Sequence, residues 1–145
     1  MIYSELVNIA IDLAYSAHHG QKDKAGRPYF VHVMHVAEQM DDEASTCAAL
    51  LHDTLEDTDM NPGLLERVFP REVAEAVKLL THKDGTDYFE YVREVKKNPI
   101  ARKVKLADLA HNLDMSRFDG CSEYLQEKAL RRREKYQEAM RILQA

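Results

Sequence analysis

The sequence predicts an all-α fold, a single-domain bundle of about seven to eight helices that spans residues 1–145. Apolar residues recur three and four positions apart along most of the chain, which is the spacing of one helix face. No stretch alternates apolar and polar residues for long enough to be a convincing strand. The chain contains no repeat, low-complexity segment or linker, and 145 residues are enough to bury a core.

Start and stop signals place the helices in order. Gly20 ends the first helix, Asp41 or Asp42 can cap the third, and Asn98-Pro99 is a cap followed by proline at the first helical position. Residues 21–28 are polar and glycine-bounded and are expected to form a loop. The expected helices are Tyr3–His19, a second around Val33–Met40, a third that ends at His52-Asp53, Pro62–Phe69, one around Val73–Leu80, Asp87–Lys97, Pro99–Phe118 and Ser122–Leu143.

Composition excludes several classes of protein. The net charge of −5 argues against a nucleic-acid-binding surface, and no run of about 18 apolar residues is present that would span a membrane. The first residues do not resemble a signal peptide. The two cysteines, Cys47 and Cys121, match neither a disulfide framework nor a zinc motif. We therefore expect a cytoplasmic protein with no nucleic-acid or membrane partner; the sequence does not predict an oligomeric state.

The most informative stretch is residues 48–58, where an apolar run leads directly into His52-Asp53 and then Glu56-Asp57. Burying an imidazole beside a carboxylate is costly unless something compensates for it, and a divalent cation would compensate for both. The alternative is a helix that simply ends in polar residues. Asp108 lies in the middle of an apolar helix segment and shares a face with Asn112, with Lys105 beside it. Taken alone, that set is more typical of a solvated stripe.

Four side chains together suggest a metal site. His32, His52, Asp53 and Asp108 come from three separate predicted helices and offer two imidazoles and two carboxylates. Helical bundles build metal sites from facing helices in this way. A mixed nitrogen and oxygen set suits manganese, ferrous iron or zinc, and Mn²⁺ suits a set with two carboxylates and open water positions.

Three segments of the chain resemble the HD superfamily of metal-dependent phosphohydrolases. The segments are Gly26–His32, Leu51–Thr58 and Lys105–Asn112, which carry the order His, His-Asp, Asp. Within that superfamily the chain most resembles the hydrolase domain of the Rel/SpoT family, which removes the 3′-pyrophosphate of ppGpp and pppGpp. The resemblance covers roughly His18 to Arg117 and implies an HD-domain bundle.

The resemblance implies a role for each matching residue. His32, His52, Asp53 and Asp108 would bind Mn²⁺, whereas Glu56 and Asp57 would position and activate the attacking water. Lys24 matches a basic loop position and Asn112 a residue near the nucleoside. The positive charges of Lys24, Arg27 and Lys105 could neutralise the phosphates of a small nucleotide substrate. His35 has no match and is expected to be structural or to support a ligand.

The chain resembles the family less closely at the substrate-binding positions than at the metal-binding positions. Asp23 stands where the family usually has an arginine beside the matched Lys24. It would repel an anionic substrate if it faced the pocket and would be harmless if it faced solvent. Val33 replaces a usual proline, Leu109 replaces an arginine, and Met115 stands near a usual nucleoside-contacting threonine.

The function expected from these residues is metal-dependent hydrolysis of (p)ppGpp at its 3′-pyrophosphate. One alternative is an HD-type nucleotidase or phosphatase that acts on another nucleotide. A second is a non-catalytic module that binds a nucleotide or a metal. The acid pair Glu56-Asp57 argues against the second alternative, because a binding module does not need to activate water.

Overall fold

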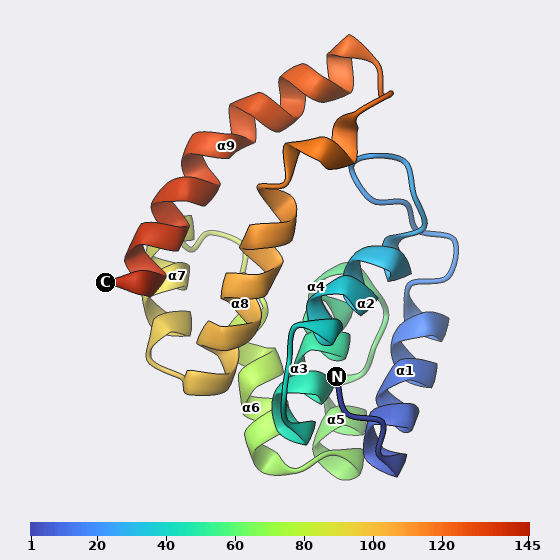
Figure 1. Cartoon of the computed structure of the whole chain (residues 1–145). Helices are drawn as coiled ribbons and strands as arrows, with labels where there is room; N and C mark the ends of the chain where they lie inside the picture. The colour runs from blue at the N-terminus through green and yellow to red at the C-terminus, as the bar shows by residue number, and fades with distance from the viewer.

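The computed structural model describes residues 1–145 and consists of helices joined by short loops (Figure 1). The all-α prediction is confirmed, since the only bridge of extended backbone is the isolated pair Lys22 and Pro28. The helices are α1 (Glu5–Ala17), α2 (Tyr29–Glu38), α3 (Glu43–Leu51), α4 (Thr54–Asp57), α5 (Pro62–Val68), α6 (Arg71–Leu80), α7 (Tyr88–Lys96), α8 (Pro99–Asn112), the 3₁₀ helix η1 (Met115–Phe118) and α9 (Glu123–Gln144).

Side-chain caps determine where most helices begin. Ser4 accepts a hydrogen bond from the backbone N–H of Val7 at the start of α1, at 3.2 Å. Asp42 caps α3 through the N–H of Ser45 at 2.7 Å, and Asn98 caps α8. Each cap satisfies a backbone donor that the first turn of a helix leaves without a partner.

Two predicted helices end earlier than expected. The third ends at Leu51, and Thr54–Asp57 form a separate turn, α4, so that His52 and Asp53 lie at a bend. The long helix predicted to reach Phe118 stops at Asn112. The carboxylate of Asp114 accepts bonds from both the N–H and the hydroxyl of Ser116, and this local pairing competes with helix continuation.

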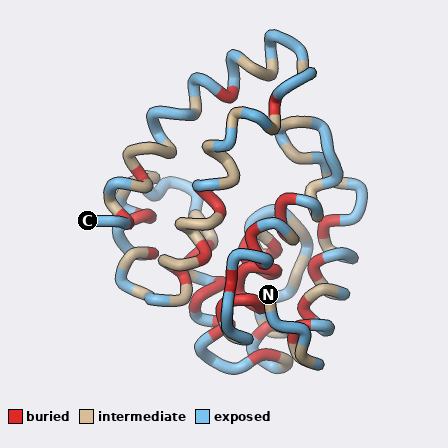
Figure 2. The backbone as a smooth tube through the Cα atoms, viewed as in Figure 1, coloured by how far each residue is buried: buried red, intermediate tan, exposed pale blue.

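The core surrounds α3. This helix packs against α1, α2, α6 and α8, and every residue from Ser45 to Leu51 is buried. Figure 2 shows the same concentration of buried backbone at the centre of the larger helical group. Because α3 is enclosed, its carboxyl end delivers His52 and Asp53 to the interior and not to the surface.

The last helix forms one wall of the molecule. α9 runs along α7, α8 and η1, and only Ala129, Ala139 and Leu143 are buried along its length. In Figure 1 it lies opposite the helices that surround α3, with α8 between them. No helix combines the length and the apolar character that crossing a membrane requires.

Candidate active site

A buried imidazole presents one ring nitrogen to two carboxylates. Nδ1 of His52 lies 2.6 Å from the carbonyl oxygen of Ala49, which can only accept, so Nδ1 carries the proton. Nε2 is therefore the nitrogen that lacks a proton whenever the ring is neutral. It lies 3.0 Å from Oδ2 of Asp53 and 3.7 Å from Oδ1 of Asp108, and no hydrogen-bond donor faces it. Three acceptors that meet in the interior need a proton or a cation between them.

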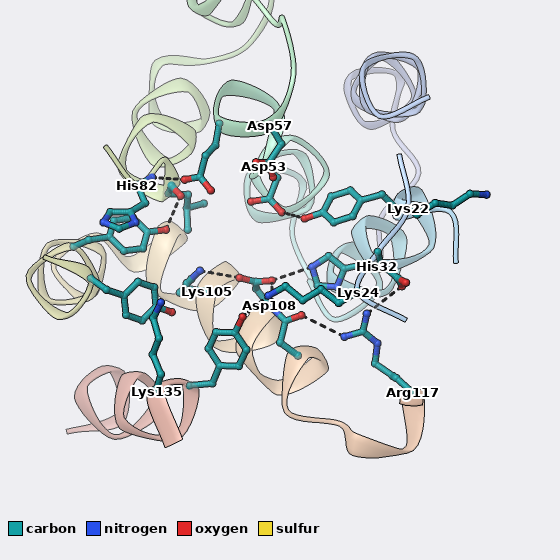
Figure 3. Close-up of a pocket in the computed structure, with 18 residues that line it drawn as sticks. Lys22, Lys24, His32, Asp53, Asp57, His82, Lys105, Asp108, Arg117 and Lys135 are labelled. Atoms are coloured by element: carbon teal, nitrogen blue, oxygen red, sulfur yellow. Dashed lines mark hydrogen bonds and ion pairs between the residues drawn. The ribbon is translucent and has the colours of Figure 1, made fainter. Parts of the chain in front are cut away.

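Asp108 joins this group to a second histidine. Its Oδ1 lies 2.9 Å from Nε2 of His32, which α2 supplies, and 3.1 Å from Nδ2 of Asn112. Its Oδ2 accepts from Nζ of Lys105 at 2.9 Å. Figure 3 shows Lys105, Asp108 and His32 connected in this order across the pocket.

The donor set fits a divalent cation. Ligand atoms of His32, His52 and Asp53 all lie within 4.8 Å of one another, and Asp108 contacts both histidines. Two imidazole nitrogens and two carboxylates are a mixed set that first-row divalent metals accept. The four residues that the sequence singled out as ligands are thus brought together by α2, the bend after α3, and α8.

Electrostatics at the group favour ionised carboxylates. Burial opposes the charged forms, but neighbouring charges outweigh it. Asp53 and Asp108 raise the pKa of His52 well above its ordinary value, whereas His52 and the hydroxyl of Tyr29 lower the pKa of Asp53 to about 2. Lys105 and the histidines hold the pKa of Asp108 well below its ordinary value. The site therefore keeps negative charge in the interior over a wide pH range.

The acid pair lies beside the metal-ligand group, on α4. Carboxylate oxygens of Asp53, Glu56 and Asp57 lie within 4.8 Å of one another. Oε1 of Glu56 accepts the backbone N–H of His82 at 2.6 Å, and the carbonyl oxygen of Asp57 accepts Nε2 of Gln21 at 2.8 Å. Partial burial, and then the negative charge of Asp53, raise the pKa of both Glu56 and Asp57. A carboxylate with a raised pKa is a better proton acceptor from water.

A cavity of about 420 Å³ holds these groups together (Figure 3). Its walls come from the loop before α2, from α2, α4, α6, α7, α8 and η1, and from α9. The predicted site residues that line it are Lys24, His32, Asp53, Glu56, Asp57, Lys105, Asp108 and Asn112. His52 lies beneath this surface with 2% of its area exposed.

Arg27 is the predicted site residue that the structure places elsewhere. It does not line the cavity, and its Nη1 donates to the carbonyl oxygen of Arg117 at 2.7 Å. The guanidinium is therefore used to tie the loop before α2 to η1. The cations that line the cavity are Lys22, Lys24, Lys105, Arg117 and Lys135.

Several aromatic residues line the cavity that the sequence analysis did not assign to it. Tyr29 donates its hydroxyl to Asp53, and it sits three residues before His32, so that helical spacing was a usable signal. Tyr136 lies on α9, and its hydroxyl accepts from Nζ of Lys24. Tyr88, Tyr91 and His82 complete this aromatic wall.

Comparison with known proteins identifies the family. The HD domain family profile matches residues 10–142. The chain therefore belongs to the HD domain family. Within the family it is related to the hydrolase domains of Rel and SpoT proteins. An HD domain with this His/Asp cluster contains a divalent-metal site.

Curated relatives and a solved structure support this relationship. A guanosine-3′,5′-bis(diphosphate) 3′-pyrophosphohydrolase of Aquifex aeolicus is 30% identical over 123 residues, which is 77% of this chain and 18% of the relative. A GTP pyrophosphokinase of Streptomyces coelicolor is 35% identical over 122 residues, 75% of this chain and 14% of the relative. The chain thus spans less than a fifth of these proteins. A solved structure of a metazoan SpoT ortholog that hydrolyzes ppGpp matches with a TM-score of 0.73 and 26% identity, covering 97% of this chain and 88% of the other.

Proposed function

We propose that this protein is a metal-dependent phosphohydrolase that removes the 3′-pyrophosphate of (p)ppGpp. The observation that carries the proposal is the cavity itself, in which a cation-binding group, a pair of proton-accepting carboxylates and several lysines face one space. The activity named for the metazoan SpoT ortholog, which matches over nearly the whole chain, supports the same substrate.

We assign the divalent cation to His32, His52, Asp53 and Asp108, with Mn²⁺ as the expected metal. The support is the position of Nε2 of His52 between two carboxylates, where a cation can take the place of a proton. A bound divalent cation lowers the pKa of its water toward neutrality and polarises a phosphoryl oxygen.

Glu56 and Asp57 are the proposed proton acceptors. Both line the cavity next to Asp53, and the raised pKa of each favours uptake of a proton from water. The backbone N–H of His82 orients one oxygen of Glu56 and leaves the other available. No nucleophilic serine or cysteine lines the cavity, so the water is the attacking group.

Lys24, Lys105 and Asn112 are the proposed substrate-binding residues. An alarmone carries several negative charges, and a chain of net charge −5 must gather positive groups locally to hold it. Lys105 is nearly enclosed, with 13% of its side chain exposed, and Asp108 and two tyrosines raise its pKa well above the ordinary value despite burial. It therefore keeps its charge beside the incoming phosphates.

We also infer that residues 1–145 act as one domain. Helices from both halves of the chain pack on α3, and the cavity takes residues from the loop before α2 through to α9. A site assembled from the whole chain needs the whole chain to fold as a unit.

A substrate panel with Mn²⁺ tests the proposed function. Purified protein is given ppGpp, deoxynucleoside monophosphates and 3′-phosphorylated nucleotides, and kcat/KM is measured for each. We expect ppGpp to exceed the others by at least about tenfold, with GDP and pyrophosphate as products. Preference for a monophosphate would replace this proposal with a nucleotidase, and failure to hydrolyse any of them would indicate a binding module.

A further inference from the structure

His32, a proposed cation ligand, forms a close contact with a second histidine, His111. Nδ1 of His32 is 2.7 Å from Nδ1 of His111, while Nε2 of His32 is 2.9 Å from Oδ1 of Asp108. Both nitrogens of His32 therefore have polar partners, and rotating the ring by half a turn would place carbon atoms against both. His32 is 2% exposed, so these contacts fix the ring within the interior.

Only one proton fits between the two Nδ1 atoms. A neutral imidazole carries a proton on one nitrogen and a lone pair on the other, so a hydrogen bond between two such atoms needs a donor on one ring and an acceptor on the other. A proton on both Nδ1 atoms would place two donors against each other at 2.7 Å, and no proton on either would place two lone pairs there. The two rings are also nearly parallel, with centroids 5.0 Å apart.

We propose that His111 is a positioning residue that sets which nitrogen of His32 carries the proton. In one arrangement, Nδ1–H of His111 donates to His32, and Nε2–H of His32 donates to Asp108. In the other, Nδ1–H of His32 donates to His111, and Nε2 of His32 presents a lone pair to a cation. The shared proton crosses the 2.7 Å contact in the change from the first arrangement to the second.

The proton count balances across the two arrangements. Nε2 of His32 gives up one proton to solvent, and Nε2 of His111 takes one from solvent. Each ring stays neutral, and the pair holds two protons throughout. Cation binding at His32 therefore does not require the pair to lose a proton.

A second cavity provides the solvent that this exchange needs. His111 and His35 both line a space of about 390 Å³ that shares no lining residue with the candidate active site. The ring of His35 stacks on His111 with centroids 3.9 Å apart and contributes no hydrogen bond to His32. His35 thus packs on His111 without contacting the hydrogen bond to His32, and His111 faces a cavity separate from the one proposed for the substrate.

The inference rests on the proposed cation site and not on the substrate, so its test measures protonation and binding instead of hydrolysis. Zn²⁺ is a suitable probe because it is diamagnetic and accepts nitrogen and oxygen ligands. Imidazole ¹⁵N NMR is recorded on chelator-treated protein and again at saturating Zn²⁺. We expect the proton between the rings to lie on Nδ1 of His111 before addition and on Nδ1 of His32 afterwards.

Three variants separate this role from packing. His111→Leu removes the acceptor and is expected to weaken Zn²⁺ binding by about 10- to 100-fold in calorimetry. His111→Asn restores a side-chain acceptor and should recover much of that loss. His35→Leu changes the same stack without touching His32 and should bind Zn²⁺ close to the parental affinity.

The possible outcomes separate the role of His111 from the existence of the cation site. Zn²⁺ that binds with Nδ1 of His32 left unprotonated overturns the inference alone, as does His111→Leu binding at parental affinity or His35→Leu losing as much as His111→Leu. Protein that does not bind Zn²⁺ at all overturns the cation site and the inference with it. The NMR measurement uses the unaltered protein, so it decides the matter even if His111→Leu fails to fold.

Discussion

Asp23 and Arg117 form a buried ion pair that joins the loop before α2 to η1. Nη2 of Arg117 lies 3.1 Å from Oδ2 of Asp23, and their side chains are 9% and 4% exposed respectively. The other oxygen of Asp23 accepts the backbone N–H groups of Ala25 and Arg27, each at 2.9 Å. Although Asp23 lines the cavity, its charge is already paired, so it neither repels a substrate nor faces solvent.

This pairing predicts that Asp23→Arg destabilises the protein. The substitution removes an acceptor for two backbone donors and places a second guanidinium against Arg117. Breaking a buried pair typically costs about 3 kcal/mol or more. Asp23→Asn is the matched comparison, because its single amide oxygen can still accept the two backbone N–H groups while the contact with Arg117 is lost, so it should destabilise the protein less than Asp23→Arg. Chemical denaturation measures both, and an Asp23→Arg protein as stable as the parent would show that the pair is not structural.

Glu56→Gln should separate chemistry from assembly. The amide oxygen can still accept the N–H of His82, so folding and cation content should be unchanged. Loss of the proton-accepting carboxylate should lower kcat by about 100-fold or more. Steady-state kinetics beside a metal assay checks both expectations. If the variant turns over at the parental rate, Asp57 is the sole candidate for the base.

Because the pKa of Glu56 is raised, we expect activity to be lost on acidification at a pH above the ordinary pKa of a glutamate. Burial raises the pKa of Glu56 first, and the charges of Asp53 and Asp57 raise it further. Because the base must be deprotonated, activity should fall as pH drops through this higher value. Replacing Asp57 with Asn removes a like charge and should move the ¹³C titration midpoint of Glu56 to lower pH. An unchanged or higher midpoint in that variant would contradict the electrostatic account.

Lys24 and Arg27 should differ in their effect on substrate binding. Lys24 lines the cavity, whereas Arg27 ties down the loop through the carbonyl of Arg117. We expect Lys24→Ala to raise KM for ppGpp by about tenfold, equivalent to one charged hydrogen bond. Arg27→Ala should change KM much less and lower thermal stability instead. Equal KM effects would place both side chains on the substrate.

Local signals in the sequence were sufficient for the fold class and for most of the residues that we propose for the site. Caps and prolines such as Asn98-Pro99 act over a few residues, and α8 begins where they predict. The His52-Asp53 motif could also be recognised, because the run of apolar residues that precedes it forms the buried helix α3. The early end of α8 was missed although Asp114 and Ser116 carried a turn signal that competes with the helix.

Long-range contacts explain what the sequence did not reveal. Tyr136 has the spacing of a core residue on α9 and reaches the cavity only because α9 packs beside α8. The pairing of Asp23 with Arg117 joins residues 94 positions apart, so no local pattern predicts it. Leu109, one of the departures from the Rel/SpoT pattern, is fully buried in the core and does not line the cavity.

The most direct test of the central claim is hydrolysis of ppGpp in H₂¹⁸O with Mn²⁺, followed by mass spectrometry of the products. The account predicts one ¹⁸O atom in pyrophosphate and none in GDP, because the proposed attack of water is on the phosphorus bonded to the 3′ oxygen. Asp53→Ala should lose bound Mn²⁺ and labelled product together, whereas Asp59→Ala, an exposed acid outside the cavity, should retain both. Absence of labelled pyrophosphate from the parent protein, or its undiminished release by Asp53→Ala, would contradict the account.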